Sequence, residues 1–269
     1  MRTMRYGVAA LLGLGFVFTA PASADAIAEA GRSLMENYRD AVVTVRVVSN
    51  QQISYPGQGT QESEQTIEAT GTIITPTGLT VLALSKVEPS SVLELMGVMN
   101  DVSIESELSD IQILRTDGSE VDAQVLLRDR DFDLVFIAPS DAVEDWSHVN
   151  LAVAANPGLL DPVIAINRLG RVAGRTHSAA SGRIEAVVER PRTLYIPSRG
   201  DGTGERGSPV FTLDGDLVGI LVMRAVRSTG RDNMSDNMIP IVLPAVDVLD
   251  AARQAPGYED DFEESNNDD

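Results

Sequence analysis

The sequence predicts an all-β fold built from short antiparallel strands. Segments rich in β-branched residues recur between residues 40 and 243 and are separated by turn signals at regular intervals. The clearest turns are Thr-Pro-Thr-Gly at 75–78, Thr-Asp-Gly-Ser at 116–119 and Asp-Gly at 214–215. Many short strands joined in this way are typical of β-barrels and β-sandwiches.

The first half of the chain is expected to begin with a helix over residues 25–39, where apolar residues recur at helical spacing. Strands are then predicted at 42–48, 70–74, 79–84, 111–115, 121–128 and 134–137. The polar stretch 51–65 contains two glycines and is predicted to be a loop. Residues 85–109 follow neither period, and the segment VLELMGVM within them fits a helical turn or an irregular insertion.

The second half repeats this pattern. Strands are predicted at 150–153, 162–166, 181–188, 194–197, 209–213, 217–223 and 237–242, followed by a helix over residues 244–255 with Pro244 at its start. Seven of the last twelve residues are acidic, so residues 256–269 are predicted to be a disordered, solvated tail. A calcium-binding or partner-docking tail is the alternative.

The N-terminus has the pattern of a secretory signal peptide. Arg2 and Arg5 precede an apolar run over residues 6–20, and the small residues Ala-Ser-Ala follow at 22–24. We therefore expect residues 1–24 to be a signal peptide that is cleaved after Ala24, and the protein to be periplasmic or extracellular. No later segment is long and apolar enough to be expected to span a membrane.

Composition argues against a nucleic-acid partner, disulfides and a zinc site. The formal net charge is −19, and removal of the two arginines in residues 1–24 would make it −21. Lys86 is the only lysine. Because such a surface has no patch that could neutralise phosphates, we expect no nucleic-acid partner. The chain has no cysteine and two histidines, so neither disulfides nor a zinc site are expected, and no cofactor is predicted.

Three segments together resemble the signature blocks of trypsin-like serine proteases, closest to the HtrA-like branch. They are ATGTIITPTGLTVLALSKV at 69–87, RDRDFDLVFIA at 128–138 and GERGSPVFTLDGDLVGI at 204–220. The resemblance covers about residues 40–255 and leaves no room for the PDZ modules of HtrA proteins. It implies two six-stranded antiparallel β-barrels of the chymotrypsin type, at about 40–145 and 146–243, with a C-terminal helix.

This resemblance assigns the three catalytic positions of the family to residues of this chain, and only one of the three carries the family's residue. The histidine position falls on Ser85, the aspartate position on Asp133 and the nucleophile position on Arg206. Gly204 and the backbone of Arg206 occupy the oxyanion-hole positions. Acyl transfer needs a base that accepts the proton of the nucleophile, and neither a serine hydroxyl nor a guanidinium can do so near neutral pH. The chain therefore resembles a pseudoprotease.

The sequence gives weaker support for a functional site at other residues. His148 and His177 are expected to be surface or turn residues, and Ser208 to support the loop around Arg206. The alternation of Asp129, Asp131 and Asp133 suits the start of a calcium loop, but the later positions of an EF-hand are absent, so a turn is expected. The glycines between 200 and 207 lack the Lys-Ser/Thr ending of a phosphate loop.

These observations predict an exported binding or scaffold module for peptides or proteins. The alternatives are a hydrolase with a displaced or incomplete site, and a structural envelope protein. At the catalytic positions assigned by the resemblance, Arg206 is expected either to pair with the Asp133 carboxylate or to point to solvent. The sequence predicts no oligomeric state.

Overall fold

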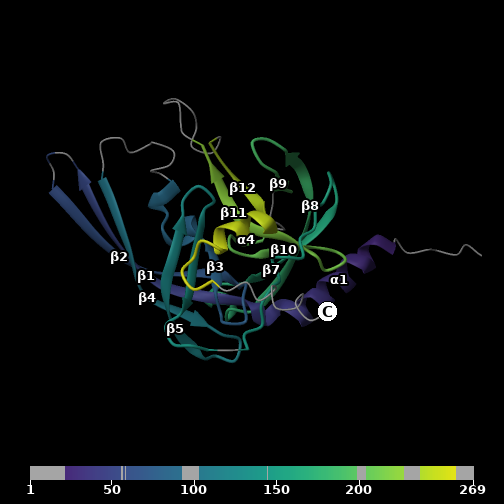
Figure 1. Ribbon diagram of the computed structural model, residues 1–269, viewed down its shortest axis with the longest axis horizontal. Helices are drawn as coiled ribbons and strands as arrows, with labels where there is room; N and C mark the ends of the chain where they lie inside the picture. The colour runs from purple at the N-terminus through teal and green to yellow at the C-terminus, as the bar shows by residue number, and fades with distance from the viewer. Residues whose placement is uncertain are drawn as a thin grey trace, which may run out of the picture.

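The computed structural model consists of two closed antiparallel β-barrels with helices packed against them (Figure 1). It describes residues 22–55, 57, 59–92, 103–143, 145–198, 204–226 and 237–258. Residues 1–21 of the expected signal peptide, most of the VLELMGVM segment and most of the acidic tail lie outside these residues. None of the helices in the described part of the chain is long and apolar enough to cross a bilayer.

The first barrel has the strand order β1-β2-β3-β6-β5-β4. Its strands are β1 (Val42–Tyr55), β2 (Gly59–Ile73), β3 (Thr80–Ala83), β4 (Ser103–Leu114), β5 (Glu120–Asp129) and β6 (Leu134–Pro139). The short helix α2 (Leu84–Val87) directly follows β3.

The second barrel has the strand order β10-β11-β12-β9-β8-β7. Its strands are β7 (Pro162–Arg168), β8 (His177–Val188), β9 (Leu194–Pro197), β10 (Pro209–Thr212), β11 (Leu217–Ala225) and β12 (Met238–Pro244). Helix α1 (Ala22–Tyr38) and the 3-10 turn η1 (Arg39–Ala41) precede the first barrel, η2 (Arg171–Ala173) lies between β7 and β8, and α4 (Ala245–Ala252) follows the last strand. The predicted all-β fold of two six-stranded barrels with a C-terminal helix is confirmed.

Strands near the centre of the molecule are apolar on both faces, because each face packs into a different core. In β6, Val135 and Ile137 pack inside the first barrel. The alternate residues Leu134 and Phe136 pack into a larger core that both barrels share with α1 and α4. Tyr38 of α1 stacks on Phe211 of β10 with ring centroids 4.7 Å apart. Because successive side chains of a strand point to opposite faces, a central strand contributes alternate residues to two different cores.

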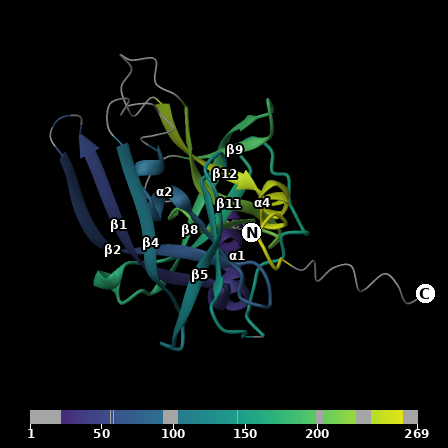
Figure 2. The ribbon, with the colours of Figure 1, turned by 60° about the vertical axis from the view of Figure 1, so that its left-hand side comes forward.

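Two local predictions from the sequence are wrong. The polar stretch 51–65 is not a loop, because β1 continues to Tyr55 and β2 begins at Gly59, with an unbroken register between them. These outer strand halves extend beyond the rest of the first barrel (Figures 1 and 2). They have no apolar alternation because water contacts both of their faces.

The strand predicted at 150–153 is a turn. The side-chain oxygen of Asn150 accepts a hydrogen bond from the Ala152 amide at 2.8 Å. An asparagine that bonds the backbone two residues later offers the chain an alternative to a sheet ladder. The apolar residues of this segment are distributed accordingly, since Leu151 is buried and Val153 is 55% exposed.

Candidate functional site

The structure brings together the three side chains at the expected catalytic positions. Ser85 lies on α2, immediately after β3, and Asp133 immediately precedes β6. Arg206 lies in the loop that enters β10 from the second barrel. The site therefore spans the junction of the two barrels, and each of its side chains lies at the end of a strand whose apolar residues anchor it in a core.

Asp133 is held in place by the turn before it. Its φ of 60° is left-handed, a conformation that aspartate tolerates better than most residues. The Asp129 carboxylate accepts the amides of Asp131 and Phe132, both at 3.0 Å, and so closes the turn. This is the turn expected from the aspartate alternation, and the described residues contain no group of acidic or histidine side chains that could hold a metal ion.

The Asp133 carboxylate is buried and accepts three hydrogen bonds. Ser85 donates its amide to Oδ1 at 2.6 Å and its hydroxyl to Oδ2 at 2.8 Å. The Met223 amide, from β11 of the second barrel, donates to Oδ2 at 2.7 Å. Asp133 is only 6% exposed, so these donors replace water around a charged group that would otherwise be costly to bury.

Arg206 neither pairs directly with Asp133 nor points only to solvent. Its Nη1 donates to the Ser85 hydroxyl at 3.0 Å, and that hydroxyl in turn donates to Asp133. The result is a chain of hydrogen bonds from guanidinium through hydroxyl to carboxylate. Next to it, Lys86 Nζ lies 3.3 Å from the Glu205 carboxylate. Two polar contacts thus connect α2 with the loop of the second barrel.

The loop around Arg206 is fixed by residues that sequence reasoning did not identify. Asn167 of β7 is 3% exposed, and its side-chain oxygen accepts the Glu205 amide and the Ser208 hydroxyl, both at 2.8 Å. The Thr72 hydroxyl of the first barrel donates to the Gly207 carbonyl at 2.7 Å. The only signal for Asn167 was a single amide side chain at the end of an otherwise apolar strand. Ser208 is fully buried and supports the loop in this network.

Gly204 and Gly207 are required by the geometry of this loop. Gly204 has φ 89°, and a Cβ there would approach Asn167 Oδ1 and Ala165 Cβ to 2.8 Å. Gly207 has φ 94°, and its Cβ would lie 2.1 Å from the Thr70 carbonyl oxygen of the first barrel. At both positions only glycine combines a positive φ with so close an approach.

Neither histidine reaches this site. The ring of His148 contacts the Trp146 carbonyl at 3.1 Å. The ring of His177, the first residue of β8, contacts the Val42 carbonyl at 2.9 Å and the Arg168 guanidinium. Burial, reinforced by Arg168, lowers the pKa of His177. Among the described residues, no imidazole contacts Ser85, Asp133 or Arg206 to act as a general base.

The Asp133 carboxyl gives the site a pH dependence. Burial raises its pKa from 3.8 to about 6, against the opposing effects of the Met223 and Ser85 hydrogen bonds and the Arg206 charge. Between these two values the folded protein retains a proton that the unfolded chain releases. The protonated carboxyl group therefore makes its full contribution to the free energy of unfolding below about pH 4, and this contribution is lost as the pH rises through about 6.

We define the stability difference as the free energy of unfolding of the wild type minus that of Asp133→Asn. We expect this difference to decrease as the pH rises from 4 to 6.5 and to stay constant above pH 7. The total change is at most about 3 kcal/mol, since each unit of pKa shift corresponds to about 1.4 kcal/mol. Urea unfolding of both proteins at intervals of one pH unit measures it, and the subtraction removes the contributions of the other carboxyl groups. A difference that is independent of pH, or that rises with it, would contradict the raised pKa.

Comparison with known proteins places these features in context. The chain matches the family described as "Trypsin-like peptidase domain" over residues 69–220, which is more than half of its length. Among solved structures, the apo crystal structure of the MamO protease domain from Magnetospirillum magneticum is similar to it, with 18% sequence identity and a TM-score of 0.47. That match covers 80% of this chain and 96% of the other. No curated protein matches the chain significantly.

Proposed function

The chain belongs to the trypsin-like peptidase domain family, and from that premise we propose that it is an exported, catalytically inactive member that binds peptides or proteins. The observation that supports this most directly is the hydrogen-bonded chain of Arg206, Ser85 and Asp133. In an active member, a base within hydrogen-bond reach takes the proton of the nucleophile. Here the corresponding contact joins a guanidinium at the nucleophile position to a hydroxyl at the base position, and near pH 7 the guanidinium cannot attack and the hydroxyl cannot accept its proton.

The surrounding residues support a binding role. The loop at 204–208 remains fixed by Asn167 and Thr72, and Lys86 and Glu205 connect the same two elements as Ser85 and Arg206. Such contacts hold the junction of the barrels in one arrangement without requiring any reaction there. A rigid all-β scaffold can bind extended segments by adding them as a further strand at a sheet edge.

The proposal predicts that the purified protein has no serine-hydrolase chemistry. Fluorophosphonate probes should not label it, and casein should remain intact after prolonged incubation. Ser85 does lie beside the Asp133 carboxylate, but it is 3% exposed and its hydroxyl also accepts a hydrogen bond from Arg206, so that oxygen is not presented to a substrate. Intact-mass spectrometry measures the labelling. Trypsin serves as the positive control and the heat-denatured protein as the control for non-specific reaction.

Stoichiometric labelling of any serine would instead favour a hydrolase with a displaced site. A structural envelope protein would be inert to the probe as well. It is distinguished by affinity capture from an envelope extract, in which a binding module should retain the same partner at physiological salt in independent preparations.

A further inference from the structure

The outer halves of three strands form a sheet that extends beyond the first barrel (Figure 2). We call residues 49–55 of β1, 59–66 of β2 and 103–109 of β4 the three-stranded extension. Strand β1 lies in its middle and pairs with β2 as far as Tyr55↔Gly59, and with β4 as far as Ser54↔Ser103. Its residues on β2 are exposed on both faces of the sheet.

Strand β2 forms a free edge of this extension. Its other neighbour in the barrel, β3, pairs with it only from Gly71 to Ile73. Over residues 59–66 the described part of the chain therefore places a strand on one side only. In an antiparallel ladder, about half of the backbone N–H and C=O groups of such a strand point away from its neighbour. The register with β1 contains no bulge, and β2 contains no proline, so the edge lacks two common obstacles to strand pairing.

One face of the extension carries four exposed glutamates. They are Glu62 and Glu64 on β2 and Glu105 and Glu107 on β4. The registers place Glu62 and Glu105 on either side of Gln52, and Glu64 and Glu107 on either side of Asn50. Residues that are directly opposite, or two apart on one strand, lie on the same face. The four carboxylates therefore form two adjacent rows with only neutral amides between them.

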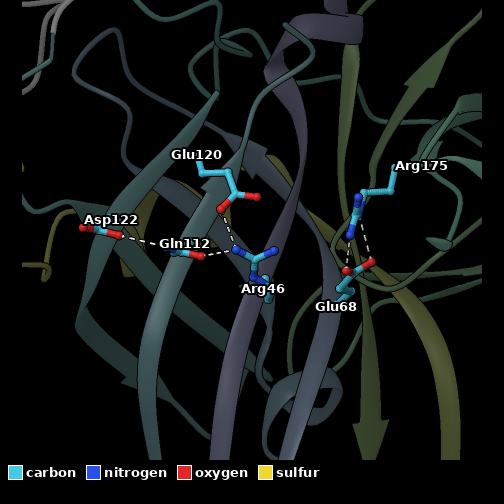
Figure 3. Close-up of polar contacts among 6 residues, drawn as sticks. All are labelled: Arg46, Glu68, Gln112, Glu120, Asp122 and Arg175. Carbon is cyan, nitrogen blue, oxygen red and sulfur yellow. Dashed lines mark hydrogen bonds and ion pairs between the residues drawn. The ribbon is translucent and has the colours of Figure 1, made fainter. Parts of the chain in front are cut away.

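At the base of the same face, arginines neutralise the corresponding carboxylates (Figure 3). Glu68 of β2 accepts two hydrogen bonds from Arg175 of the second barrel, at 2.6 and 3.1 Å. Arg46 of β1 forms an ion pair with Glu120 at 2.6 Å. Beyond these pairs, the four glutamates of the extension have no cationic partner among the described residues. Arg175 thus shows how a basic side chain from outside the first barrel is accommodated on this face.

We propose that the free edge of β2 over residues 59–66 binds an extended segment that carries Lys or Arg at every second position. Added as a further strand, such a segment satisfies the outward backbone groups of β2. Because its side chains alternate between the two faces, basic residues two apart lie beside Glu62 and Glu64. This inference rests on the proposed function and specifies its binding surface and partner. A second copy of the chain is a poorer occupant, since two β2 edges would bring their own glutamates together.

The test compares two blocked octapeptides of identical composition by fluorescence anisotropy at about 0.15 M salt. In one, Lys and Thr alternate; in the other, Lys-Lys and Thr-Thr pairs alternate, so that no two Lys are two residues apart. The alternating peptide should bind about tenfold more tightly, because only its spacing places Lys beside both Glu62 and Glu64 on one face. Hydrogen exchange should slow at the amides of residues 59–66 when it binds.

Two matched double variants locate the site. Glu62→Gln/Glu64→Gln should weaken binding of the alternating peptide about fivefold. Glu105→Gln/Glu107→Gln makes the same change in charge on β4, at the far side of β1, and should weaken binding by about twofold or less. Equal affinity for the two peptides, equal losses in the two variants, or no protection of residues 59–66 would overturn the inference, as would a dimer formed through β2 in sedimentation experiments.

The outcomes also separate this inference from the proposed function. A captured protein partner whose affinity is unchanged by Glu62→Gln/Glu64→Gln would overturn the β2 site and leave the binding role intact. Cleavage of the peptide, detected by mass spectrometry, would overturn the catalytically inactive assignment, whereas the two double variants would still decide whether the peptide binds at β2.

Discussion

Replacing Asp133 with alanine is expected to lower the free energy of unfolding by about 3–5 kcal/mol at pH 7, because it removes the acceptor of a buried polar network. Three donors lose their partner at once: the amide and hydroxyl of Ser85 and the amide of Met223. Buried donors without an acceptor each cost roughly 1–3 kcal/mol. Because Met223 belongs to the second barrel, the loss weakens the contact between the barrels as well as the turn before β6.

Urea unfolding followed by circular dichroism measures this effect. The neighbouring Asp131→Ala is the matched control, since its side chain is exposed and its substitution should stay within about 0.5 kcal/mol. Arg206→Ala should cost only about 1 kcal/mol, the value of one partly exposed hydrogen bond. A double-mutant cycle between Ser85→Ala and Arg206→Ala should show coupling above about 0.5 kcal/mol. Additive losses would mean that the two side chains do not meet in solution.

Gly207→Ala is expected to destabilise the protein by about 3 kcal/mol or more, because the new methyl group meets the backbone of the other barrel. A Cβ at this position lies 2.1 Å from the Thr70 carbonyl oxygen, and φ is 94°. The backbone strain alone costs of the order of 1–3 kcal/mol for a residue other than glycine. The steric overlap adds to it, since β2 is held by pairing with β1 along its whole length and cannot easily withdraw.

Gly215→Ala separates the two contributions. Gly215 has nearly the same φ, 96°, but no heavy atom lies within 4 Å of its Cβ position. Its substitution should therefore show the backbone strain without the overlap, and Gly207→Ala should exceed it by at least about 1 kcal/mol. Equal melting temperatures for the two variants would show that the barrels do not approach each other at Gly207 as closely as described.

The all-β class was predictable because its signals are local, whereas the division into two six-stranded barrels was implied by the resemblance to trypsin-like proteases. Runs of β-branched residues, turn dipeptides and the helical spacing at both ends of the described chain specify elements through contacts between near neighbours in sequence. The errors also have a local cause. The residues at 51–65 are polar on both sides, so no alternation distinguished strands that are exposed on both faces from a loop. At Asn150 a side-chain hydrogen bond to the backbone prevailed over the strand propensity of the apolar residues that follow.

The residues alone predicted an all-β fold of short antiparallel strands, and their resemblance to trypsin-like proteases implied two six-stranded barrels with Ser85 and Arg206 at the histidine and nucleophile positions. Only the tertiary structure decided how these residues meet. Ser85 and Arg206 are 121 residues apart, and their hydrogen bond depends on the docking of one barrel against the other. The same docking brings Met223 to Asp133, and strand register places Glu62 and Glu105 on one face. Such contacts arise from the packing of two cores and from long-range pairing, which no local pattern of residues encodes.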